Sequence, residues 1–180
     1  MKLNLTKLIS SIIICVFDGA VGSIFTTAEI GGWYKGLNKP VFNPPNWIFG
    51  PVWTLLFILM GISLYLVWSK KFVVKNELKI GHRKAWNHFS QKFYNGVWQK
   101  ENIIIIFGTQ LVLNVLWSAV FFGMHSPGVA FFELLMLWFA ILYTIMNFYR
   151  VSKEAAYLLI PYILWVSFAG ILNLSIFLLN

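Results

Sequence analysis

The chain has 180 residues, a length typical of one domain. Hydrophobic residues make up 59% of it and charged residues 11%, whereas soluble domains contain about half and about a quarter. A soluble fold of this size cannot bury so much apolar surface, so the composition excludes that class and indicates an integral membrane protein. The net charge of +8 would favour nucleic-acid binding in a soluble chain, but here it fits basic loops beside a bilayer, and we expect no nucleic-acid partner.

Five apolar segments are each long enough to cross a bilayer as a helix, which takes about 20 residues. Their uninterrupted apolar runs lack the strict alternation that lipid-facing strands require. The expected fold is therefore all-α, a single domain over residues 1–180 that forms an integral membrane five-transmembrane-helix bundle. The predicted spans are approximately 7–28, 46–69, 102–124, 127–149 and 154–178.

The first span begins like a signal peptide, with Lys2 and Lys7 ahead of an apolar core. Its apolar character resumes after Asp18 and continues to Ala28, which is long for a cleaved signal. We therefore interpret it as a retained helix that contains a carboxylate at membrane depth. For Asp18 the favoured interpretation is a structural one, a protonated acid that is hydrogen-bonded to a neighbouring helix.

The connections between the spans are unequal in length and charge. Residues 29–45 form a Gly/Pro/Asn-rich first loop, and residues 70–101 form a long basic insertion. Twelve Lys and Arg residues fall on the side of the N-terminus and only Lys35 and Lys39 on the other. The positive-inside rule predicts a multi-pass protein, in the cell membrane as we expect, with the N-terminus and second loop cytoplasmic and the first loop and C-terminus outside.

Prolines stiffen the first loop, because each fixes φ and removes a backbone donor. Pro40, Pro44 and Pro45 precede Asn46, which we expect to cap the second span at its N-terminus. Such a loop can serve as a lid over a flat apolar ligand, or it can be an ordinary interfacial loop. Composition alone leaves both interpretations open.

Polar residues mark one face of the third span, where Gln110, Asn114, Trp117 and Ser118 recur at helical spacing. Polar side chains at membrane depth normally face the bundle interior. They can bind a ligand there, or they can join helices by hydrogen bonds. The spacing does not decide between these roles.

The fifth span repeats this pattern with Tyr162, Trp165, Ala169 and Asn173 on one face, after a helix-loosening Pro161. A small residue beside a large ring can form a slot for a planar ligand, or it can allow two helices to pack closely. In the fourth span, Glu133 is an intramembrane acid for which a site role and a structural role are equally compatible.

No catalytic triad, paired-carboxylate site, phosphate-binding glycine loop or metal motif occurs in the sequence. Cys15 is the single cysteine, so no disulfide framework exists. His82, His88 and His125 fall in predicted loops and share no ligand spacing. We therefore expect neither a metal site nor a resident cofactor.

Three groups of residues, in the same order along the chain, resemble the motifs of the TspO/MBR family (translocator protein, tryptophan-rich sensory protein). They lie in the first loop and second span, in the third span, and in the fifth span, and together cover about residues 20–175. The motifs are Trp33-Tyr34-x-x-Leu37-x-Lys39-Pro40, Pro44-Pro45-x-Trp47 and Gly50-Pro51-Val52-Trp53-Thr54; Gln110-Leu111-x-Leu113-Asn114-x-x-Trp117-Ser118; and Pro161-Tyr162-x-x-Trp165-x-x-Phe168-Ala169-x-x-Leu172-Asn173.

This resemblance implies a five-helix bundle, usually a homodimer, with a ligand pocket beneath the first loop. The family binds tetrapyrroles such as protoporphyrin IX, and some bacterial members are assigned light-dependent porphyrin breakdown through two tryptophans, which correspond to Trp53 and Trp165. The other family pocket positions fall on Trp33, Tyr34, Pro44, Asn114, Ser118 and Ala169, while Glu133 stands where relatives carry an acid. Trp117, Tyr162 and Asn173, from the two polar faces, complete the expected site.

Two departures from the family pattern bear on function. Animal members bind cholesterol through a Tyr and a basic residue at the end of the fifth helix, where this chain has Leu174 and Leu178. The insertion over 70–101 is longer and more basic than usual, and it can bind anionic lipid or a partner or be a solvated loop. The leading hypothesis is porphyrin binding linked to transport or sensing. The alternatives are a light-dependent porphyrin-degrading enzyme and a sterol or lipid transporter.

Overall fold

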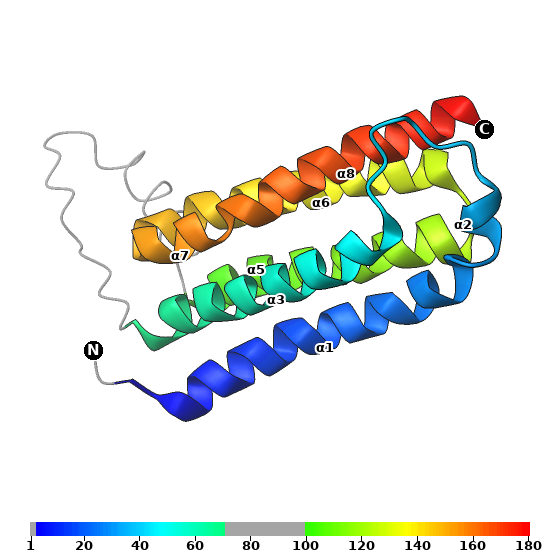
Figure 1. Ribbon diagram of the computed structural model, residues 1–180. Coiled ribbons are helices and arrows are strands. Elements are labelled where there is room, and N and C mark those ends of the chain that lie inside the picture. Colours follow the sequence, from blue (N-terminus) through cyan, green and yellow to red (C-terminus); the bar gives the residue numbers. More distant parts are fainter. Residues whose placement is uncertain (1–2, 71–99) are drawn as a thin grey trace, which may run out of the picture.

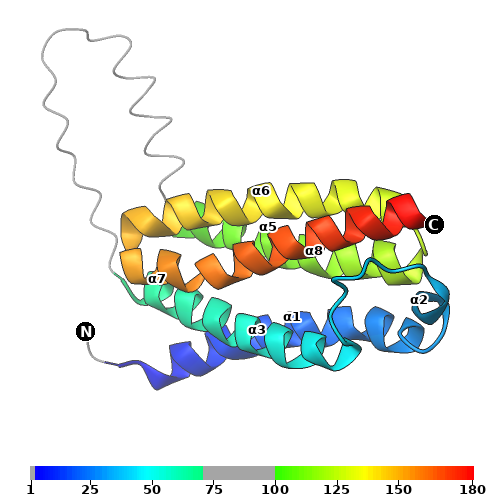
Figure 2. The ribbon, with the colours of Figure 1, turned by 45° about the horizontal axis from the view of Figure 1, so that its top comes forward.

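The computed structural model describes residues 3–70 and 100–180, and it is helical with no strand in these two ranges. Most of the predicted basic insertion, residues 71–99, lies outside the described part. Five helical segments of the described chain are long and apolar enough to cross a membrane, which confirms the all-α, five-span prediction. Figure 1 and Figure 2 show them side by side, with the two chain ends at opposite ends of the bundle.

The first, second and fourth spans are single helices, α1 (Leu5–Glu29), α3 (Asn46–Ser69) and α6 (Pro127–Val151). The other two are interrupted. The third consists of α5 (Lys100–Ser118) continued by a π-helical turn, η1 (Ala119–Gly123). The fifth breaks at Leu159 into α7 (Lys153–Leu158) and α8 (Ile160–Leu179), because Pro161 has no N–H to continue the ladder of the preceding helix.

The first loop is more ordered than its composition indicated. It contains a short helix, α2 (Trp33–Gly36), followed by an extended segment that crosses the C-terminal part of α8 before entering α3 (Figure 1). Asn38 fixes this crossing, since its N–H donates to Asn180 Oδ1 at 2.9 Å and its Nδ2 to the Leu179 carbonyl at 3.3 Å. The predicted N-cap was wrong by one residue, because Asn46 is itself helical and Pro45 precedes it without a side-chain cap.

Close helix approach holds α1 against α3. A Cβ placed on Gly61 of α3 would lie 2.6 Å from the Ile12 Cα of α1, so glycine is required for the two backbones to come this near. Nearer the cavity the glycine belongs to α1, and a Cβ placed on Gly19 would clash with the Phe57 ring of α3. Small residues at such contacts let dispersion forces act between helices where lipid removes the hydrophobic driving force.

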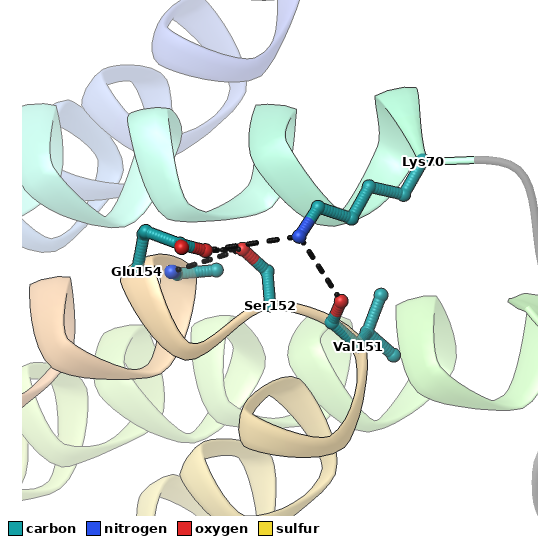
Figure 3. Close-up of polar contacts among 5 residues, drawn as sticks. Lys70, Val151, Ser152 and Glu154 are labelled. Carbon is teal, nitrogen blue, oxygen red and sulfur yellow. Dashed lines mark hydrogen bonds and ion pairs between the residues drawn. The ribbon is translucent and has the colours of Figure 1, made fainter. Parts of the chain in front are cut away.

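Polar contacts join the bundle at the end opposite α2 (Figure 3). The Lys70 Nζ, just after α3, donates to the Val151 carbonyl at 3.2 Å and lies 3.7 Å from Glu154 Oε2. Ser152, between α6 and α7, caps the start of α7 by donating to Glu154 Oε2 at 2.6 Å and accepting from the Ala155 N–H. Because Lys70 and Glu154 are exposed, their ion pair adds at most about 1 kcal/mol.

The close approach at Gly61 predicts that Gly61→Ala lowers the free energy of unfolding by about 1–3 kcal/mol, because its methyl group must displace the α1 backbone. Gly108→Ala is the matched control, since nothing lies within 4 Å of a Cβ built there. The measurement is denaturation of detergent-solubilised protein by SDS, followed by tryptophan fluorescence. Equal stability of the two variants would contradict this packing model.

Candidate ligand cavity

A cavity of about 540 Å³ opens near the α2 end of the bundle. Its walls come from α1, α3, α5, η1 and α8, and Tyr34 of α2 contributes to its roof. Ligand pockets in proteins commonly measure about 300–1,000 Å³ and are lined mainly by apolar and aromatic side chains. This cavity therefore has the size and lining of a site for one medium-sized apolar molecule.

Eight of the twelve residues expected from the sequence line this cavity, and they come from four separate elements. The structure brings together Tyr34, Trp53, Asn114, Trp117, Ser118, Trp165, Ala169 and Asn173. The other four, Trp33, Pro44, Glu133 and Tyr162, lie outside its lining.

Trp53 and Trp165 reach the cavity from α3 and α8. The Trp53 ring stacks on Phe57 with centroids 5.5 Å apart, and it meets the Tyr162 ring edge-on at 6.2 Å. Trp165 packs against Phe49 at 5.9 Å and Phe168 at 5.5 Å. Both indoles are thus held by neighbouring rings, which fixes two large aromatic surfaces on the cavity walls.

Tyr162 lies behind this wall. Its side chain is fully buried and supports Trp53, and no described residue hydrogen-bonds to its hydroxyl. Glu133 of α6 is also buried, 4% exposed, with neither carboxyl oxygen partnered in the described part of the chain. Neither residue lines the cavity, so a role in binding would have to be indirect.

Asn173 joins three helices at the cavity wall. Its Oδ1 accepts from the Trp117 Nε1 of α5 at 3.1 Å, and its Nδ2 donates to the Pro127 carbonyl at the start of α6 at 2.7 Å. Both ends of the amide are therefore engaged within the protein. The two polar faces predicted in the third and fifth spans meet here, through the hydrogen bond between Trp117 and Asn173.

Asn114 makes the second polar contact of the wall. It is 5% exposed, and its Nδ2 donates to Asp18 Oδ2 of α1 at 3.3 Å. The hydrogen bond expected between Asp18 and a neighbouring helix is thus present, with the Asp18 carboxyl oxygen as its acceptor. This bond joins α1 to α5 beside the cavity.

The lid, defined here as residues 30–45, packs on an aromatic cluster supplied by η1. Tyr34 lies 6.3 Å from Phe121 and 5.6 Å from Phe122, while Trp117 stacks on Phe121 at 5.3 Å. The wider π-helical turn lets two consecutive phenylalanines both face inward, and such turns are frequent at functional sites. The lid therefore rests on rings that also line the cavity.

Tyr34 also stabilises the lid from within. Its hydroxyl donates to Asn43 Oδ1 at 3.1 Å, and the Asn43 Nδ2 donates to the Pro44 carbonyl at 3.0 Å. Burial raises the pKa of the Tyr34 phenol above its ordinary value, so it stays neutral and keeps donating over the physiological range. Pro44 thus contributes to the shape of the lid and not to the cavity wall.

A latch formed by His125, Glu29 and Trp33 closes the lid from outside. The His125 ring stacks on the Trp33 indole with centroids 4.5 Å apart and planes at 15°, and its Nε2 lies 3.2 Å from Glu29 Oε2. His125 adopts a positive φ of 50° in the turn before α6, a conformation uncommon outside glycine. The ends of α1, α2 and η1 therefore meet at this one side chain.

Sequence reasoning missed two parts of this arrangement. His125 was noted only as a loop histidine without ligand spacing, and nothing local indicated that it meets Glu29 and Trp33. The α1 wall could have been found by periodicity. Gly19, Ser23, Thr26 and Thr27 recur at helical spacing as one small, hydroxyl-bearing face and all line the cavity.

Within residues 3–70 and 102–180, no group of three or more His, Cys, Asp or Glu side chains lies close enough together to hold a metal ion. The cavity also lacks an acid–base pair in contact with a nucleophile. Its chemistry is that of binding by shape, aromatic contact and a few hydrogen bonds.

Comparison with known proteins agrees with the motifs. The model of the TspO/MBR family matches residues 11–179. The chain belongs to the TspO/MBR family. It is 39% identical to the tryptophan-rich protein TspO of Archaeoglobus fulgidus over 178 residues, 99% of each chain. It is also 32% identical to protein CrtK of Rhodobacter capsulatus over 99% of this chain and 95% of that one.

An animal protein is also similar to most of the chain. The chain is 37% identical to the human translocator protein over 155 residues, which are 85% of this chain and 78% of that protein. The motifs in the lid and in the third and fifth spans therefore belong to a membrane protein of TspO type, and in this chain they surround the cavity.

The latch predicts that His125→Asn loosens the lid. Asparagine tolerates the left-handed backbone but removes the ring that stacks on Trp33. Amide hydrogen exchange within residues 31–42 should become about fivefold faster, since an aromatic pair contributes about 0.5–1.5 kcal/mol.

The measurement is hydrogen exchange followed by mass spectrometry in detergent micelles. Lys153→Ala is the control, because the Lys153 ammonium lies over the Tyr149 ring, 5.6 Å from its centroid, at the opposite end of the bundle. Unchanged exchange in the His125 variant would show that the lid is held by its other contacts.

Proposed function

We propose that this protein binds a tetrapyrrole, such as protoporphyrin IX, in the cavity beneath the lid. The observation that carries the proposal is that Trp53 and Trp165, from helices far apart in sequence, line one cavity of about 540 Å³. A flat, largely apolar ring gains affinity by leaving water or lipid for fixed aromatic surfaces. Family membership supports the same class of ligand.

In this proposal the cavity residues have distinct roles. Trp53 and Trp165 contact the faces or edges of the macrocycle, Asn114 and Ser118 supply polar contacts, and Tyr34 closes the roof. Ala169 leaves room beside Trp165 because it has no side chain beyond Cβ. Trp33 acts indirectly, through the latch.

The charge distribution of the sequence supports one orientation. We propose that the lid and the C-terminus face the outside of the cell membrane, and that the N-terminus and the basic segment after Lys70 face the cytoplasm. Ligand then reaches the cavity from the outer side or from the outer half of the bilayer. We further propose that the protein is a homodimer, as the family resemblance implies.

Porphyrin binding is tested by titrating purified protein with protoporphyrin IX and following the porphyrin absorption band. Trp53→Ala and Trp165→Ala should each weaken binding about tenfold, because each removes an aromatic contact. Trp68→Phe is the control, since Trp68 lies at the opposite end beside Lys7. Absence of saturable binding to the unaltered protein would remove the proposed function.

A second function is supported by the same placement of Trp53 and Trp165. Light could drive oxidative opening of the bound porphyrin, with dissolved dioxygen as oxidant. One C=C bond of the macrocycle breaks, and each of its carbons gains one oxygen atom of O₂. An indole would transfer an electron to the excited porphyrin and later take one back, so the protein is unchanged at the end of the reaction.

Illumination of the protoporphyrin IX complex tests this second function. Loss of the porphyrin bands in the presence of dioxygen should slow at least about tenfold in Trp53→Phe and Trp165→Phe, which keep a ring but lose the readily oxidised indole. Porphyrin in empty micelles and the Trp68→Phe variant are the controls. Bands that bleach equally in all samples would limit the protein to binding.

A further inference from the structure

On the α1 and α5 side of the cavity, several side-chain donors already make hydrogen bonds within the protein. On α1, the hydroxyls of Ser23, Thr26 and Thr27 donate to carbonyls of their own helix at 2.7, 3.3 and 2.8 Å. On α5, the Trp117 N–H donates to Asn173. All four residues line the cavity. Because the three α1 hydroxyls already donate their hydrogens, they can only accept a hydrogen bond from a ligand.

Asp18 engages the Asn114 amide in the same way. The Asn114 Nδ2 is turned toward α1 by its 3.3 Å bond to Asp18 Oδ2. Because the amide group is planar, its Oδ1 is directed away from that bond, and no described residue donates to it. The carbonyl oxygen of Asn114 is therefore the polar atom that the side chain can offer to a ligand.

The opposite walls differ in character. The Trp165 N–H of α8 has no acceptor in the described part of the chain and is itself buried, so Trp165 presents its ring to the cavity and not its donor. The Ser118 hydroxyl of α5 can donate or accept a hydrogen bond, so it does not discriminate between donor and acceptor groups of a ligand. The cavity is thus asymmetric, with acceptors on α1 and α5 facing an indole wall.

We propose that Asp18 is a positioning residue that makes the α1–α5 wall select ligands with an N–H donor on the edge facing Asn114. This inference goes beyond the proposed function, because the N–H groups of protoporphyrin IX point to the centre of its ring and cannot reach Asn114 from an edge. A ligand that offers only an acceptor at this edge would leave two oxygens facing each other. An unpaired buried acceptor costs more than a hydrogen bond contributes.

Carbazole and dibenzofuran are suitable probes, because these flat tricycles have nearly the same shape and differ by N–H against O. Fluorene, with CH₂ at that position, reports on shape alone. Dissociation constants are measured by equilibrium dialysis against protein in micelles, with empty micelles subtracted. The unaltered protein should bind carbazole about tenfold more tightly than dibenzofuran, the ratio that one well-made hydrogen bond gives.

Asp18→Ala should remove this preference, because the Asn114 amide is then free to turn over and present either end. Asp18→Asn should keep it, since an amide oxygen at position 18 still accepts from Asn114 Nδ2. Asn114→Leu preserves volume but removes the carbonyl, so it should abolish the preference while fluorene still binds. This variant tests the idea even where Asp18→Ala does not fold.

The inference is overturned by equal binding of the two probes to the unaltered protein, or by a preference that survives in Asp18→Ala or Asn114→Leu. Protoporphyrin IX is titrated in parallel to separate the two proposals. Porphyrin binding without probe discrimination removes only the role of Asp18. Probe discrimination without porphyrin binding removes the tetrapyrrole assignment and leaves the selection of N–H donors in place.

Discussion

The cavity end of the bundle depends on the two hydrogen bonds of the Asn173 side chain. One amide accepts from Trp117 and donates to the Pro127 carbonyl, so it holds α5, α6 and α8 in a fixed relation. In a bilayer interior there is little water to replace either partner, and an unsatisfied group costs free energy. The position of η1, and through it the seat of the lid, follows from this junction.

The lid and the cavity wall are one aromatic assembly. Phe121 contacts Trp33 and Tyr34 of the lid as well as Trp117 of the wall, so a change on either side reaches the other through packed rings. His125 completes the assembly from outside. Phe121 is therefore the ring through which the lid and the cavity wall are in contact.

Much of the architecture could be predicted from the sequence, and the reasons are local. Apolar runs of sufficient length dictated the five spans, since a lipid-exposed backbone must satisfy its own hydrogen bonds. The polar faces of the third and fifth spans predicted inward-facing Asn114, Trp117, Trp165 and Asn173, all of which line the cavity. Local signals did not reveal the short helix α2 or the π-helical turn, because tertiary packing around the lid favours both.

The sequence by itself determined that this is a five-span membrane protein with paired polar and aromatic helix faces, because helix period and hydrophobic length are properties of contiguous residues. Only the tertiary structure decided which polar groups satisfy each other and which remain for a ligand. Asn114 and Asn173 look equivalent along the chain, yet Asn173 is engaged at both ends of its amide while Asn114 keeps its carbonyl oxygen. That difference arises from neighbours on other helices, which the spacing within one helix does not encode.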